Sequence, residues 1–134
     1  MRIRYNEYPP NYKEICQVLK VSGVQGAIFT YGDTVYVPGG AALPNHLSQN
    51  ESIHVSQQTK MGADKWWAQY LADPEFRLRQ ELEAYRYELR YIKKSYRRED
   101  RRILEAHIVR SLASKMYGNI VTKQQAKRLM KEGV

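Results

Sequence analysis

The chain has 134 residues, of which 43% are hydrophobic, so it can form one globular domain, and a disordered chain is excluded. Its single cysteine excludes an internal disulfide, and the N-terminus has no apolar leader, so we expect an intracellular, reducing location. No apolar run approaches the roughly 18 residues of a membrane span, so no membrane partner is expected, and the formal net charge of +8 makes the protein basic.

Residues 1–43 are predicted to form a short helix followed by a β-hairpin. The helix is expected to be capped by Asn11 and to end before two glycines. The β-rich runs 27–31 and 34–37 are separated by Gly32-Asp33, which is typical of a tight hairpin. The apolar positions of this helix are Ile15, Val18 and Leu19, to which Cys16 can be added.

Residues 44–134 are predicted to be mainly helical. Pro44 suits the first turn of a helix over residues 44–60, which contains the motif described below. Asp64 is expected to cap a short helix that carries two tryptophans.

Three more helical features follow in the C-terminal half. Asp73-Pro74-Glu75 provides a cap, a first-turn proline and a first-turn acid for a long helix that runs to about Lys94. Another helix is predicted over about 99–117, and Thr122 and Gln125 form a capping box for the last one. These elements predict an α+β fold in one domain over residues 1–134, with a small N-terminal sheet packed on a predominantly helical part.

Residues 50–58 read Asn-Glu-Ser-Ile-His-Val-Ser-Gln-Gln, which differs by one residue from the zinc-protease pattern H-E-x-x-H. On a helix, the intact pattern places two histidines on one face, where both bind one Zn²⁺ and the glutamate polarises its bound water. Here Glu51 and His54 are present, but Asn50 stands at the position of the first ligand. The motif therefore has the form of a zinc site that lacks one of its usual ligands.

The helical wheel places Asn50, Glu51 and His54 on one inward face of their helix. Polar groups on such a face need hydrogen-bond partners or a function, so a hydrogen-bonded core helix without metal chemistry is the alternative. Three apolar side chains are expected on the same face: Leu43, Leu47 and Met61.

Neither His46 nor Asn50 is a good substitute for the missing ligand. His46 lies eight residues before His54, about 12 Å along the helix axis, too far for both to bind one Zn²⁺. An amide is a poor zinc ligand beside imidazole. We therefore expect the Asn50 side chain to make a hydrogen bond at the vacated ligand position.

The long helix offers one further carboxylate for such a site. Glu81 lies about 60° from Leu78, at the edge of the apolar stripe, whereas Glu83 lies about 140° away and is predicted to face solvent. Glu81 is thus the candidate third ligand. Its alternative role is to stabilise the N-terminal half of the helix or to pair with Arg77. The apolar stripe consists of Leu78, Leu82, Tyr85, Leu89 and Ile92.

The chain resembles a family of small bacteriophage-encoded, zincin-like metallopeptidases over most of its length. The resemblance implies that Glu51 is the general base and that His54 and Glu81 are zinc ligands, with zinc as the cofactor. Asn50 departs from the family pattern H-E-x-x-H-x-x-Q-Q, so weakened or lost peptidase activity is expected. The resemblance rests on ordered segments: YPPN (8–11), YGDTVYVPGG (31–40), ESIHVSQQ (51–58), WW (66–67), YLADPEFR (70–77), QELEA (80–84) and MYG (116–118).

The resemblance also implies a partner and a location. Zincins hold peptide substrates antiparallel to an edge strand above the active helix, and the run 34–37 is the candidate edge. An ordinary hairpin that covers the core is the alternative. A phage origin places the protein in the cytoplasm of the infected host or in the virion, with a peptide or a phage structural protein as its partner.

Residues 86–102 carry eight Lys or Arg against three acids, a net charge of +5. Tyrosines interleave with these residues, and phosphate contacts combined with aromatic stacking would suit nucleic acid. A solvated helix surface and a docking site within a phage particle are the alternatives. The candidate polyanion-binding residues are Arg90, Lys93, Lys94, Arg97, Arg98 and Arg101.

Overall fold

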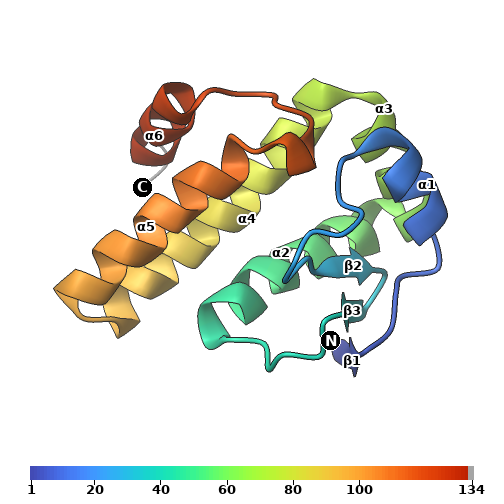
Figure 1. Cartoon of the computed structure of the whole chain (residues 1–134), viewed down its shortest axis with the longest axis horizontal. Coiled ribbons are helices and arrows are strands. Elements are labelled where there is room, and N and C mark those ends of the chain that lie inside the picture. The colour runs from blue at the N-terminus through green and yellow to red at the C-terminus, as the bar shows by residue number, and fades with distance from the viewer. Residues whose placement is uncertain (133–134) are drawn as a thin grey trace.

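The computed structural model describes residues 1–132 and confirms the α+β class, with a small sheet packed on a helical assembly (Figure 1). In chain order the elements are β1 (Arg2–Tyr5), α1 (Tyr12–Val18), β2 (Phe29–Tyr31), β3 (Thr34–Val37), α2 (Asn45–Met61), α3 (Ala63–Ala72), α4 (Pro74–Ser95), α5 (Arg98–Leu112), the 3₁₀-helix η1 (Lys115–Tyr117) and α6 (Lys123–Glu132). Within these residues, no helix has both the length and the apolarity to cross a bilayer.

The sheet has the strand order β1-β3-β2, so β3 is its central strand. β2 and β3 form the predicted antiparallel hairpin, in which Thr30 pairs with Val35. On the other side of β3, β1 pairs in parallel, with Ile3 opposite Val35. The expectation that residues 34–37 are an edge strand is therefore wrong. The pairing of β1 with β3 joins residues more than thirty positions apart, and all four residues of β1 are exposed. No local sequence pattern therefore predicts this strand.

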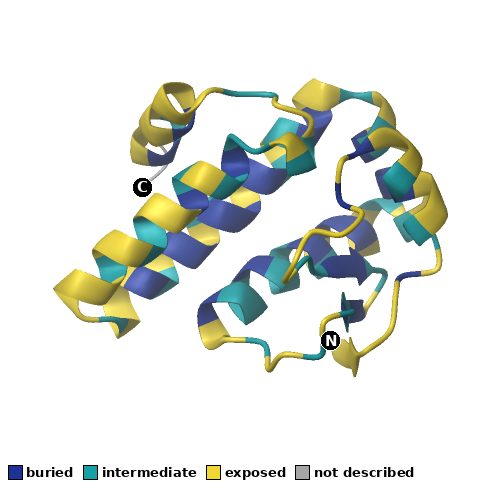
Figure 2. Cartoon of the chain, in the orientation of Figure 1, coloured by how far each residue is buried: buried dark blue, intermediate teal, exposed yellow. Residues whose placement is uncertain are grey.

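Helix α2 lies between β2 on one side and α4 on the other, and its contact with α4 is the most extensive helix packing of the fold (Figure 1). Apolar packing is divided between two separate clusters. One lies around α1, the sheet and α3, and includes Ile15, Phe29 and Trp66. The other joins α4, α5 and α6, and includes Ile92 and Ile108. Buried positions therefore line the inner faces of the helices (Figure 2).

Two of the four predicted helix caps are confirmed and two are wrong. Asp73 caps α4 by accepting hydrogen bonds from the next turn, and Thr122 exchanges hydrogen bonds with Gln125. Asn11 makes no side-chain cap to α1. Asp64 lies inside the first turn of α3, where its carboxylate accepts a hydrogen bond from a tyrosine of β2 instead of capping the helix.

Two other elements differ in detail from their sequence patterns. Of the apolar positions in the N-terminal helix, Val18 is 51% exposed, and α1 ends there, whereas the next residue, Leu19, is buried. The helix predicted over 99–117 ends at Leu112, and a separate 3₁₀ turn follows at η1. That turn brings Tyr117 beneath α4, which a continuous helix would not do.

A buried arginine ties three segments together next to the candidate site. Arg77 is 4% exposed and donates hydrogen bonds to the backbone carbonyls of Tyr70, Leu71 and Tyr117 at 2.9–3.1 Å. The first two carbonyls belong to the last turn of α3, where a cation also complements the helix dipole. Gly118 permits the close approach of η1, because a Cβ there would lie 2.9 Å from a guanidinium nitrogen.

We predict that Arg77→Lys lowers the free energy of unfolding by about 2–3 kcal/mol, because an ammonium cannot reach three carbonyls in a fixed fork. Urea unfolding followed by circular dichroism measures the change. Arg79→Lys, an exposed position on the same helix, is the control and should change the stability by less than about 0.5 kcal/mol. Equal effects of the two substitutions would contradict this role for Arg77.

Candidate functional site

The buried face of α2 is polar. His46, Asn50 and His54 recur every four residues, and Gln57 and Gln58 extend this face toward the C-terminal end of the helix. None of the five is more than 8% exposed. The three apolar side chains that the wheel placed here are only partly buried. The helix is therefore held to its neighbours chiefly by hydrogen bonds rather than by apolar packing.

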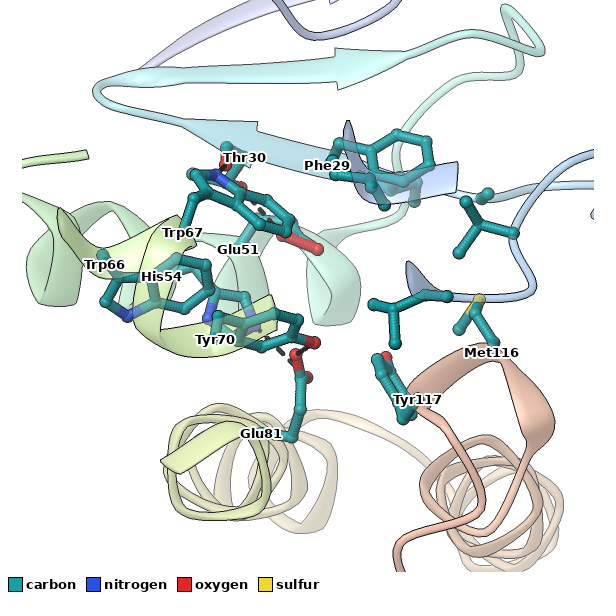
Figure 3. A pocket seen from close by; sticks show the side chains of 15 residues that line it. Phe29, Thr30, Glu51, His54, Trp66, Trp67, Tyr70, Glu81, Met116 and Tyr117 are labelled. Carbon is teal, nitrogen blue, oxygen red and sulfur yellow. Dashed lines mark hydrogen bonds and ion pairs between the residues drawn. The ribbon is translucent and has the colours of Figure 1, made fainter. Parts of the chain in front are cut away.

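His54 and Glu81 lie together, as expected from the wheel. The Nε2 atom of His54 is 3.3 Å from Oε1 of Glu81, and the carboxylate is almost fully buried. Tyr70 on α3 donates its hydroxyl proton to Oε2 of the same carboxylate at 2.5 Å. Glu83 is exposed, also as expected. The carboxylate of Glu81 is thus enclosed by an imidazole and a phenol (Figure 3).

The hydrogen bonds of His54 indicate a doubly protonated ring. Its Nδ1 lies 2.9 Å from the side-chain amide oxygen of Gln57. The amide nitrogen of Gln57 donates to a backbone carbonyl and to Glu83, so the oxygen is the atom that faces His54. Both ring nitrogens therefore face acceptors. Burial lowers the pKa of His54, but the charge and hydrogen bond of Glu81, with the charge of Glu51, outweigh it and raise the pKa to about 9. The ring is an imidazolium at neutral pH.

Glu51 is the half-buried acid on the sheet side of α2. Its Oε2 accepts a hydrogen bond from the Thr30 hydroxyl at 2.9 Å. Burial raises the pKa of Glu51 to about 7, against the opposing positive charge of His54 and with a further rise from Glu81. A pKa near neutrality is what general acid–base chemistry requires, so Glu51 has the protonation behaviour of a base.

Asn50 hydrogen-bonds the carboxylate of Glu88, whereas His54 contacts that of Glu81. Its Nδ2 donates to Oε1 of Glu88 at 3.0 Å, and Nδ1 of His46 lies 2.8 Å from the other oxygen. Glu88 is 1% exposed, so water does not solvate its carboxylate. Among residues 1–132, the Asn50 amide and the His46 ring are the only side chains that hydrogen-bond this buried charge. The hydrogen bond expected for Asn50 is present, and its acceptor, Glu88, was not among the predicted site residues. Glu88 lies seven residues after Glu81, two turns along the same face of α4, and this spacing is the sequence pattern that could have identified Glu88 as a second inward carboxylate.

A cavity of about 60 Å³ lies beside these groups (Figure 3). Its polar wall is formed by Glu51, His54 and Glu81, together with the hydroxyls of Tyr70 and Tyr117. Burial, and then the charge of Glu81, raises the pKa of both tyrosines well above the usual range, so both stay protonated. A water takes up about 30 Å³ of liquid, whereas ligand pockets run to roughly 300–1,000 Å³. The cavity admits waters or an ion but not a peptide. Its apolar wall includes Ile15, Leu19, Val21, Phe29 and Met116.

The sheet edge beside the site is already occupied by side chains. Gln58 donates to the carbonyl of Thr30 at 2.9 Å and accepts from the backbone nitrogen of Gly32 at 2.6 Å. Trp67 donates to the same carbonyl at 3.0 Å. The Gln58 amide thus takes the place that a peptide group of an added strand would occupy. Along β2, these hydrogen bonds compete directly with the pairing of a substrate strand.

The residues present do not fit the three-ligand zinc centre that the resemblance implies. Two ligands of one tetrahedral Zn²⁺ lie roughly 3.4 Å apart, a spacing that His54 and Glu81 match at 3.3 Å. However, both ring nitrogens of His54 already face hydrogen-bond acceptors, Glu81 and Gln57. The amide of Asn50 is bound to Glu88, so the third position has no donor. Within residues 1–132, no group of three or more His, Cys, Asp or Glu side chains is arranged to hold a metal ion.

The residues predicted to bind a polyanion lie toward the end of the α4–α5 hairpin, away from the site. Five of the six are exposed, and Arg101 is half-buried. The interleaved tyrosines do not all form an open stacking surface. Tyr85 is 7% exposed and shares a hydrogen bond with another tyrosine, and Tyr96 packs edge-on against His46. The predicted combination of phosphate contacts and base stacking therefore loses part of its aromatic component.

Comparisons with protein-family models, with curated proteins and with solved structures gave no match. The resemblance to phage metallopeptidases therefore rests on the sequence segments alone. The roles of Glu51, His54 and Glu81 therefore stay predictions.

The raised pKa values predict how stability depends on pH. The pKa of Glu51 rises from 4.5 to about 7 and that of His54 from 6.5 to about 9, so the folded chain binds more protons than the unfolded chain. The stabilisation is complete below the unfolded pKa values and is lost as pH rises through the folded ones. Unfolding free energies measured near pH 5, 7 and 9 should therefore fall in that order.

A matched variant separates the two contributions. Glu51→Gln should flatten the dependence at acidic pH and leave the loss between neutral pH and about pH 9, which belongs to His54. An NMR titration of the His54 ring should show the imidazolium persisting above neutral pH. A ring that loses its proton below neutrality would refute the doubly protonated assignment.

We also predict that Glu88→Ala destabilises the fold by about 3 kcal/mol or more, because His46 and Asn50 lose their buried acceptor. Glu83→Ala on the same helix is the control, and its exposed carboxylate should cost about 1 kcal/mol. Thermal and urea unfolding of both variants measure the difference. A loss for Glu88→Ala no larger than that of the control would show that Asn50 and His46 do not depend on this carboxylate.

Proposed function

We propose that this chain is a metallopeptidase-related phage protein in which zinc-dependent peptide hydrolysis is lost, and that its fold serves as an interaction or structural module. The observation that carries the proposal is the hydrogen bond from Asn50 to Glu88. The residue at the position of the first ligand is engaged by a buried carboxylate, so releasing it toward a metal would leave Glu88 short of a donor. The cost of such a buried unpaired charge is several kcal/mol.

The contacts of the other two zinc-site residues support the same proposal. His54 uses Nε2 for Glu81 and Nδ1 for Gln57, so no nitrogen of its ring is free for a metal. Tyr70 donates to the second oxygen of Glu81. Two of the residues that would be ligands in a zinc peptidase, His54 and Glu81, thus have their polar atoms engaged by each other and by neighbouring side chains.

The surroundings of Glu51 support the loss of substrate binding. A peptide would have to pair with the edge strand β2, whose Thr30 carbonyl already accepts hydrogen bonds from Gln58 and Trp67. The cavity beside Glu51 is about 60 Å³. A peptide substrate would have to displace these side chains, each of which is buried, before it reached Glu51. The proposed location, the cytoplasm of the infected host or the virion, follows from the resemblance.

We predict that the wild-type chain binds Zn²⁺ weakly and that Asn50→His raises its affinity. Structural zinc sites with four ligands gain roughly 10–16 kcal/mol, so one more imidazole should tighten binding on the order of 100-fold. Glu88 would then accept a hydrogen bond from the new ring, as carboxylates commonly do for zinc-bound histidines. Competition with a chromogenic chelator measures the affinity, and casein hydrolysis with added zinc measures the activity.

Ser56→His is the matched control, because it adds an imidazole to the exposed side of the same helix. It should leave the zinc affinity unchanged. Tight stoichiometric zinc in the wild type, or zinc-dependent casein hydrolysis by it, would overturn the proposal. An equal gain in both variants would mean that the new histidine binds at the surface and not at His54 and Glu81.

A further inference from the structure

A groove of about 980 Å³ lies between α4, α5 and α6, on a different side of α4 from the candidate site. Its base is made of aliphatic side chains that belong to the second apolar cluster: Leu89, Ile108, Val109 and Met130. The volume is at the upper end of what small-ligand pockets reach, roughly 1,000 Å³. The groove is therefore large enough for side chains of a macromolecular partner.

Six cationic side chains line the groove, against one acid, Glu105. All six are exposed, and none forms an ion pair within residues 1–132. Holding so many like charges together without counter-charges is unfavourable unless anions are nearby. They are Lys93, Arg102, Arg110, Lys123, Lys127 and Lys131.

Five of the six cations stand in two rows with helical spacing, and the sixth, Lys93, lies on α4. On α6 they occur at every fourth residue, from Lys123 to Lys131. On α5, Arg102 and Arg110 are eight residues apart, with the small exposed Ala106 midway between them. Each row extends about 12 Å, two helical turns, along its helix. The aliphatic base therefore has a basic row on α6 and another on α5.

We propose that this groove docks an amphipathic α-helix of a partner protein, with an apolar stripe that is flanked by Asp and Glu residues. Apolar anchors at helical spacing would rest on the base of Val109 and Met130, and the acids would meet the two cationic rows. The inference deepens the interaction role proposed above by naming the class of partner. It stands on residues that the zinc question does not involve.

Two other occupants fit the groove less well. Single-stranded nucleic acid stacks its bases on aromatic side chains, and no aromatic residue is among those that line this groove. An aliphatic base also offers nothing to a phosphate backbone. A second copy of this chain carries a net charge of +8 and would be repelled from a basic surface.

Fluorescence anisotropy of the full chain tests the proposal. The probe is a labelled synthetic helix of about 18 residues, with Leu at the i, i+3, i+4 and i+7 positions and Glu beside them. A scrambled peptide of the same composition, whose leucines do not form a stripe, is its control. We expect the amphipathic peptide to bind at least tenfold more tightly than the scrambled one at physiological salt. A single-stranded DNA oligonucleotide and a single-stranded RNA oligonucleotide serve as competitors.

Charge-reversal variants of the protein locate the binding site. The triple variant Lys123→Glu, Lys127→Glu, Lys131→Glu should weaken peptide binding at least tenfold. The triple variant Lys13→Glu, Lys20→Glu, Lys60→Glu makes the same change in net charge at exposed positions outside the groove. It should have little effect, since surface charges are screened beyond about 8 Å at physiological salt.

A third variant tests the base of the groove without changing the charge. Ala106→Trp fills the space between the two arginines of α5 and should weaken peptide binding while circular dichroism shows the fold intact. Equal binding of the scrambled peptide, or equal loss in both triple variants, would overturn the proposal. Tighter groove-dependent binding of an oligonucleotide than of the peptide would also overturn it, in favour of nucleic acid. None of these results depends on zinc, so they leave the lost-peptidase proposal to its own test.

Discussion

Two buried carboxylates on one face of α4 fix how α2 lies in this protein. Glu81 faces His54, and Glu88, two turns later, faces Asn50 and His46. Because the buried face of α2 is polar, apolar packing alone cannot set its register. A slip of one turn would exchange the positions of His46, Asn50 and His54 relative to the two carboxylates and would break all three of these contacts. The polar seam between α2 and α4 therefore selects one arrangement of the two helices.

The other parts of the site follow from that arrangement. With α2 fixed on α4, its opposite side presents Gln58 to the carbonyl of Thr30 and Glu51 to the Thr30 hydroxyl. The sheet is thus attached through the same helix that carries the altered zinc motif. In a metal centre, the cation would neutralise the acids. Here the imidazolium of His54 faces one oxygen of Glu81, and the hydroxyl of Tyr70 donates a hydrogen bond to the other.

Local sequence patterns could identify the individual elements and one side of the seam. The helical wheel separated inward Glu81 from exposed Glu83, and the caps at Asp73 and Thr122 were visible in a few adjacent residues. Non-local pairings could not be read in this way. The strand β1 carries no buried residue. Asp64 has the sequence context of a helix cap, but in the fold its carboxylate accepts a hydrogen bond from the Tyr31 hydroxyl. Polar residues have several alternative partners, and only the assembled fold selects among them.

The placement of charge distinguishes the interior of this chain from its surface. Inside, each acid of the seam accepts hydrogen bonds from side chains of α2 or α3. On the surface, the positive excess gathers along α5 and α6, where acids of the chain itself do not balance it. Helix α4 belongs to both regions, with Glu88 in the seam and Leu89 beneath the groove. A partner in the groove would therefore rest on a helix that the buried carboxylates hold against α2, while the shape of the groove is set by the apolar cluster that joins α4, α5 and α6.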